Sequence, residues 1–203
     1  MVVITILRQM QFLKKNPQSQ FATLRYSVVA EREALRKGLL SEQYGFCAYS
    51  ERFVQNSDSC NIEHFYPKTE NPTREDDYMN MFAAHSWMDA HKPKKIAPYL
   101  PILEPHSDDL HDRIVYEGGI FKCVNEDDAA AQNLIDFLGF NKYEVSEDRR
   151  RHLSRIKLLR SWKTEPEFYT YLKEHRQELS YATALEKELS IPAMQMIIES
   201  FEL

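Results

Sequence analysis

The sequence contains few of the features that mark secreted or membrane-spanning proteins. Its three cysteines have no paired spacing, which argues against a disulfide framework and fits a reducing compartment. No apolar run approaches the roughly 20 residues that cross a bilayer, so we expect no contact with a membrane. The N-terminal stretch has no basic region ahead of its apolar residues and no small-residue cleavage site. We therefore expect no signal peptide and a cytosolic protein.

The charge balance also lacks the excess of positive charge that broad nucleic-acid-binding surfaces carry. The formal net charge is −5, so any contact with nucleic acid should be local or should be completed by a partner. No Gly-x-x-x-x-Gly-Lys sequence is present, which argues against a P-loop for nucleotide phosphates. Hydrophobic residues make up 43% of the 203 residues, which is enough for one compact domain with its own core.

One short stretch of the chain holds the side chains that phosphodiester hydrolysis requires. The reaction needs a base to activate water, a divalent cation to take up charge at the scissile phosphate, and a rigid frame. His64 can be the base, and Glu63 and Asp89 can hold a hard cation through oxygen. Asn80 can pin the loop that carries the histidine. A Glu-His pair alone is common on surface strands, so the prediction depends on the combination.

The pattern of apolar residues predicts an α+β, predominantly α-helical fold. Helices are predicted at residues 17–39, 78–92, 129–138, 146–163, 165–179 and 182–201. Hairpins are predicted within residues 41–68, with the turn at 56–58, and at residues 114–124. We expect one compact unit with an N-terminal helical segment at 1–40, a ββα core at 41–95, and a loop-rich connection with a C-terminal helical region at 96–203.

Three stretches within this map resemble HNH endonucleases of bacterial anti-phage defence, the Septu-type and retron-associated nucleases. They are QYGFCAY at residues 43–49, IEHFYPK at 62–68 and YMNMF at 78–82. The resemblance covers roughly residues 20–165, and IEHFYPK is its most specific part. It identifies residues 41–95 as a small ββα-metal (HNH) core embedded in a helical domain.

The resemblance implies a role for each candidate residue. His64 would be the general base, Asn80 the central amide of the motif, and Lys92 a contact to phosphate. The implied ligands of Mg²⁺ or Mn²⁺ are Glu63, Asp89 and, as an alternative, His91. The implied partners are a nucleic acid, DNA or RNA, and an ATPase subunit of the ABC or OLD type that would regulate this chain as its nuclease effector.

Further basic residues are candidate contacts to nucleic acid. They are Lys68 of the IEHFYPK stretch and two arginines of the basic run near the predicted helix 146–163, Arg149 and Arg155. The simpler interpretation of such a run is a solvated helix face. Adjacent residues diverge by about 100° on a helix, so the arginines of the run must cover more than one face.

The chain departs from these nucleases where they commonly hold structural zinc. In place of two Cys-x-x-Cys pairs it has Cys47 with Ser50 and His85 with Met88. A closed zinc site needs four Cys or His donors, so we expect structural zinc to be absent, although Cys60 could act as a third ligand. We interpret Cys47 and Met88 as core residues.

Two other functions compete with the endonuclease. The first is a catalytically degenerate HNH subunit that binds an ATPase or a nucleic acid without cleaving. The second is a helical partner-binding protein without nuclease ancestry, which predicts no strand, loop and helix around His64.

Overall fold

The computed structural model describes residues 10–201 and has an α+β, predominantly helical architecture, which confirms the predicted fold class. The first nine residues of the expected N-terminal segment lie outside the described part. The strands form two antiparallel pairs, β1 (Cys60–His64) with β2 (Met81–His85) and β3 (Ile114–Glu117) with β4 (Ile120–Cys123). The α-helices are α1 (Arg32–Glu42), α2 (Ser86–His91), α3 (Leu110–Arg113), α4 (Ala129–Leu138), α5 (Tyr143–Ser161), α6 (Glu165–Glu174), α7 (Ala182–Leu189) and α8 (Ala193–Phe201). Within residues 10–201, no helix combines the length and the apolar composition that a bilayer crossing requires.

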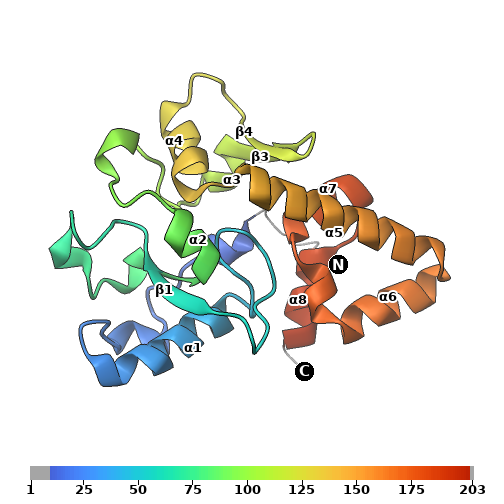
Figure 1. Cartoon of the computed structure of the whole chain (residues 1–203), viewed down its shortest axis with the longest axis horizontal. Helices are drawn as coiled ribbons and strands as arrows, with labels where there is room; N and C mark the ends of the chain where they lie inside the picture. Colours follow the sequence, from blue (N-terminus) through green and yellow to red (C-terminus); the bar gives the residue numbers. More distant parts are fainter. Residues whose placement is uncertain (1–9, 202–203) are drawn as a thin grey trace, which may run out of the picture.

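The first sheet and the helix after it form a β–β–α unit. β1 and β2 pair so that Cys60 lies opposite His85 and His64 lies opposite Met81. α2 begins directly after β2. Figure 1 shows β1 between α1 and α2, with the C-terminal helices α5 to α8 on the other side of the molecule. A strand, a loop and a helix therefore surround His64. The interpretation of the chain as a helical protein without nuclease ancestry predicted that this arrangement would be absent.

The pairing partner of β1 differs from the predicted one. We expected both strands within residues 41–68, but residues 44–54 make a turn closed by a single bridge between Phe46 and Phe53. β1 instead pairs with residues 81–85, which we had predicted to be helical. The side chain of Gln43 bonds both backbone groups of Ala83, each at 2.8 Å, and thereby fixes β2 from its other side. Of the predicted helix at residues 78–92, only the last part is helical, and it forms α2. This helix ends before Pro93, as expected.

Two other predicted helices have different limits. α1 begins only at Arg32, because the preceding residues form 3₁₀ turns and the amide of Ser27 bonds the carboxylate of Asp76 at 2.7 Å. The predicted helix 182–201 is divided into α7 and α8. Ser190 between them has a positive φ of 53°, and Pro192 cannot continue a helix. Predicted helix 165–179 also ends early, at Glu174, and a 3₁₀ turn follows at Arg176–Leu179.

Several predictions are confirmed. α4 spans the predicted residues, and its first turn is capped by the carboxylate of Asp128, which accepts from the Ala131 amide at 3.0 Å. The hairpin predicted at 114–124 is β3 and β4, whose turn consists of Gly118 and Gly119 at φ values of 59° and 87°. Two successive positive φ values are what a tight hairpin turn requires. α5 begins three residues before its predicted start.

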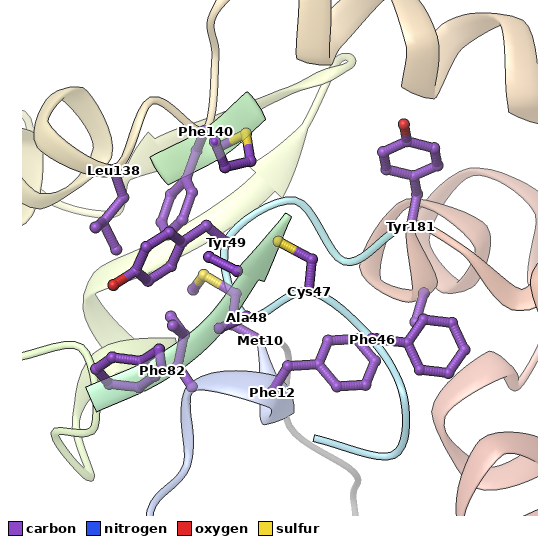
Figure 2. Packing of buried hydrophobic residues seen from close by; sticks show 14 of the residues in the cluster. Met10, Phe12, Phe46, Cys47, Ala48, Tyr49, Phe82, Leu138, Phe140 and Tyr181 are labelled. Carbon is purple, nitrogen blue, oxygen red and sulfur yellow. The ribbon is translucent and has the colours of Figure 1, made fainter. Parts of the chain in front are cut away.

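Aromatic side chains join the N-terminal part of the chain to the sheet. The rings of Phe12 and Phe46 stack at 5.0 Å, and the rings of Tyr49 and Phe82 lie 5.7 Å apart. Figure 2 shows these side chains in one cluster with Leu138 of α4. The strand β2 is therefore buried, and its neighbour β1 presents its end, with His64, at the edge of this core.

The turn at residues 44–53 is also tied to the C-terminal helices. Arg176 Nη2 donates to the Tyr44 carbonyl at 2.7 Å, and the Phe53 amide donates to Ser180 Oγ at 3.0 Å. The Tyr181 amide donates to the Glu51 carbonyl at 2.8 Å, and the amide and hydroxyl of Thr183 donate to the Glu51 carboxylate at 3.0 and 2.5 Å. Because Glu51 accepts from Thr183, it also caps the N-terminus of α7. The C-terminal helices thus fix the turn that carries Tyr49.

Candidate functional site

His64 ends β1 with its imidazole held in one orientation. Its Nε2 lies 2.8 Å from the carbonyl oxygen of Glu75, and the ring packs edge-on against Tyr26 at 4.7 Å. A carbonyl oxygen can only accept, so Nε2 carries the hydrogen and the neutral ring has its free lone pair at Nδ1. Burial lowers the pKa of His64 below its usual range, and the positive charge of Lys68 adds to this effect. The imidazole is therefore a neutral base near pH 7.

Asn80 holds the loop between β1 and β2. Its Oδ1 accepts from the Tyr66 amide at 2.7 Å, and its Nδ2 donates to the carbonyls of Tyr66 and Arg74, each at 3.1 Å. The side chain is 1% exposed, so these bonds replace all contact with water. The amide thus pins the start of the loop to its end, as the sequence analysis expected.

Glu63 and Lys92 form a buried ion pair beneath His64. Lys92 Nζ lies 2.5 Å from Glu63 Oε1 and also donates to the carbonyls of His64 at 2.7 Å and Phe65 at 3.1 Å. The hydroxyl of Tyr49 donates to Glu63 Oε2. Burial raises the pKa of Glu63 and lowers that of Lys92, while each charge opposes the shift of the other. The predicted phosphate contact of Lys92 is therefore wrong for this structure, since the side chain is directed inward and Lys92 is only 5% exposed.

A cavity of about 330 Å³ opens beside the end of β1. It is lined by the three side chains of the sequence-based hypothesis and by three lysines: His64, Glu63, Asp89, Lys68, Lys92 and Lys94. Asp89 is half-buried and accepts from Asn61 Nδ2 at 2.8 Å. The structure thus brings to one cavity the groups that the sequence predicts to converge. It also adds a lysine, Lys94, that sequence reasoning missed.

The arrangement does not fit a divalent ion held jointly by Glu63 and Asp89. Both oxygens of Glu63 already have partners, one a cation and the other a hydroxyl. Across residues 10–201, no three His, Cys, Asp or Glu side chains are placed to share a metal ion. An ion at this position requires Lys92 to leave Glu63.

His91, the alternative ligand, lies away from the cavity. Its ring stacks on Trp87 at 4.1 Å, and its Nδ1 lies 2.7 Å from the Trp87 carbonyl. The residue is exposed and is not among those that line the cavity. A position two residues after Asp89 on a helix is rotated by about 200°, which directs the side chain to the opposite face.

The positions that correspond to zinc ligands in the resembled nucleases gather in space. Ser50, His85 and Met88 line a second cavity of about 200 Å³, and the Cys47 sulfur accepts from the His85 amide at 3.3 Å. Cys47 and Met88 are buried, which confirms their interpretation as core residues. Burial raises the pKa of the Cys60 thiol to about 11, so the thiol is protonated at neutral pH.

The two arginines predicted to contact nucleic acid form hydrogen bonds or an ion pair with other groups of the protein. Arg149 is 3% exposed, and its Nη2 lies within 3.3 Å of the carbonyls of Gly119 and Phe140 and within 3.2 Å of Ser146 Oγ. It fixes the β3–β4 turn to α5, so its predicted role is wrong. Arg155 makes a two-bond ion pair with Glu178.

Lys68, the third basic residue predicted to contact nucleic acid, lies at the mouth of the cavity beside His64. It lines the cavity with 37% of its side chain exposed, and its Nζ lies 4.1 Å above the ring of Tyr26 and 3.5 Å from Glu75. Tyr26 and the Glu75 carbonyl could not be identified from the sequence, because a backbone acceptor and an aromatic ring far away in the chain leave no local pattern.

No protein-family model and no curated protein matches the sequence.

Proposed function

We propose that this chain is an HNH-type endonuclease that hydrolyses phosphodiester bonds in DNA or RNA. The observation that supports this most is the state of His64. Its imidazole is neutral, its Nε2 is committed to the Glu75 carbonyl, and it lines a cavity that also contains lysines. A neutral base beside positive charge suits water activation at a phosphate.

In this proposal the residues in and next to the cavity have separate roles. His64 Nδ1 accepts the proton of the attacking water. Lys68 and Lys94 supply positive charge that attracts the phosphodiester. Asn80 holds the loop after His64 in one conformation through three hydrogen bonds. Because both oxygens of Glu63 already have partners, Glu63 and Asp89 do not fit a shared ion, and no step of the proposal uses Mg²⁺ or Mn²⁺. The cleavage assay below varies these two ions directly.

The proposal includes a cellular role that rests on the sequence resemblance alone. The chain would be the effector of an anti-phage defence system and would act beside an ATPase of the ABC or OLD type. The exposed arginines of α5, Arg150 and Arg151, are available for such a partner, although each also bonds Glu147.

Cleavage by the wild-type protein and by His64→Ala tests the proposal. Plasmid DNA and total RNA are incubated with each protein in MgCl₂, MnCl₂ or EDTA, with and without the ATPase. Loss of a positioned general base lowers the rate by roughly 100- to 10,000-fold. His175→Ala is the matched control, because His175 is half-buried and bonds the Tyr171 carbonyl at 2.9 Å, away from the cavity. Equal cleavage by wild type and His64→Ala, or none by either, would end the enzyme proposal.

A second candidate is the degenerate HNH subunit, and the buried Glu63–Lys92 pair favours it. A carboxylate that is neutralised by an internal lysine has a structural partner and is not free to act on a substrate or a metal ion. This function predicts that wild type and His64→Ala bind a fluorescent oligonucleotide or the ATPase equally and that neither cleaves.

A further inference from the structure

Two large apolar side chains lie one helical turn apart on the outer face of α5. Leu158 is 50% exposed, and Trp162, at the C-terminal end of the helix, is 74% exposed. Residues four positions apart are neighbours on a helix surface, so these two side chains lie side by side. The opposite face, with Leu153 and Ile156, packs on the core. Figure 1 shows that α5 extends from the β3–β4 hairpin to the edge of the molecule. Leu158 and Trp162 therefore form an apolar pair that the described chain leaves uncovered.

Two small residues stand beside this apolar pair. Ser154 precedes Leu158 by four residues and Ser161 follows it by three, so both lie on the same exposed face. Their hydroxyls donate to carbonyls of their own helix, Ser154 to Arg150 at 3.0 Å and Ser161 to Leu158 at 2.7 Å. The serines thus need no further partner, and their small side chains let another helix approach closely.

A cavity of about 500 Å³ continues this face toward the β3–β4 turn. It is lined by residues of both elements, among them Gly118, Gly119, Glu147, Arg150, Ser154 and Lys157. The outer face of α5 is therefore one side of a groove, and the hairpin turn is the other.

The charges around the apolar pair are positive. Residues 149–163 contain no aspartate or glutamate. Four arginines of this segment form ion pairs with carboxylates elsewhere in the chain: Arg150, Arg151, Arg155 and Arg160. Lys157 and Lys163, by contrast, have no carboxylate partner among residues 10–201. They stand directly before Leu158 and directly after Trp162, so the apolar pair has an unpaired ammonium group at each end.

An acidic amphipathic helix complements this surface. Its apolar face would cover Leu158 and Trp162, and its carboxylates would meet Lys157 and Lys163. We propose that the outer face of α5 is a docking site for an acidic amphipathic helix of a partner protein. A nucleic acid fits less well, because phosphates need free cations and four arginines of the segment already have partners. This inference goes beyond the proposed nuclease and does not depend on cleavage or on the sequence resemblance.

Binding of two labelled helical peptides to the full chain tests the inference. The acidic probe is a peptide of roughly 20 residues with leucines along one face and glutamates along the other. The second probe has lysine in place of each glutamate. Because the net charge of the protein is −5, general electrostatics favour the lysine peptide. We expect fluorescence anisotropy to show that the acidic peptide binds more tightly, by roughly tenfold or more, which only a local surface can explain.

Substitutions on α5 assign the binding to this face. Leu158→Ser and Trp162→Ala should each weaken binding of the acidic peptide by roughly tenfold or more, because a few buried aromatic and aliphatic side chains carry most of the affinity. The double variant Lys157→Gln/Lys163→Gln should weaken it by roughly 3- to 10-fold at low salt. Leu100→Ser is the matched control, because Leu100 is 56% exposed but lies outside α5, and its Kd should equal that of the wild type. All these side chains are exposed or half-buried, so circular dichroism should show an unchanged fold.

The emission of Trp162 gives a second readout. The chain has two tryptophans, so Trp87→Phe leaves Trp162 as the single one, and its emission should shift to shorter wavelength when the acidic peptide covers it. Absence of binding, equal binding by Leu158→Ser and the wild type, or tighter binding of the lysine peptide overturns the inference. A single-stranded oligonucleotide is titrated in parallel. If it binds more tightly than the acidic peptide and is weakened by the same substitutions, the face contacts nucleic acid and the inference is wrong.

Discussion

Replacing Asn80 by alanine removes the three hydrogen bonds that close the loop between β1 and β2. The amide of Tyr66 and the carbonyls of Tyr66 and Arg74 would lose their partners at a position that is 1% exposed. Each such bond contributes about 1 kcal/mol to stability, so the expected loss in free energy of unfolding is about 3 kcal/mol. For a chain of 203 residues this lowers Tm by roughly 6–12 °C.

Urea denaturation of Asn80→Ala measures this loss directly. Asn133→Ala is the control, because Asn133 is half-buried and donates a single bond to the Pro101 carbonyl at 2.8 Å. We expect its effect to be about 1 kcal/mol or less. A loss in Asn80→Ala no larger than that in Asn133→Ala would refute the argument that this amide holds the loop.

Two further predictions concern buried charges outside the cavity. Burial raises the pKa of Glu51 to about 7 from 4.5, so between these values the folded protein keeps a proton that the unfolded chain has lost. The stability of the wild type relative to Glu51→Gln should therefore fall as pH rises from 4.5 to 7, by on the order of 3 kcal/mol, and parallel urea midpoints at pH 5 and pH 8 would contradict this. Arg149→Met should cost roughly 2–4 kcal/mol in urea denaturation, because three oxygens lose their donor, whereas Arg150→Met on the exposed face should cost less than about 0.5 kcal/mol.

The helices with strong local signals were predictable from the sequence. Asp128 caps α4 and Pro93 follows α2, and both act within a few residues of the boundary that they set. The hairpin of β3 and β4 was predictable because Gly118 and Gly119 determine its turn. These features require no knowledge of distant contacts.

The pairing of β1 was not predictable from local pattern. Residues 81–84 are continuously apolar and fully buried, and such a run has no periodicity that separates a strand from a helix. The choice of β2 over the 44–54 turn depends on Gln43, which bonds Ala83 from forty residues away. The turn residues at 56–58 suggested a local hairpin that the tertiary contacts overrule.

Part of the lining of the cavity was predictable, but its burial was not. His64, Glu63 and Asp89 do share a cavity. The inward direction of the Lys92 side chain follows from the packing of α2 on β1, which no local sequence pattern reveals. The burial of Arg149 was detectable in principle. It shares the spacing of Val145, Leu153 and Ile156, the other buried residues of α5, so it lies on the apolar face of that helix.

The bonds between the turn at residues 44–53 and residues 176–183 have a consequence for synthesis on the ribosome. The chain leaves the ribosome with its N-terminus first, so the turn is outside the ribosome long before Arg176, Ser180 and Thr183 are made. Until then Glu51 lacks its bonds to Thr183 and the Tyr44 carbonyl lacks its bond to Arg176, so the segment that positions Tyr49 against Glu63 is incompletely anchored. We expect the cavity beside His64 to reach its final form only late in translation.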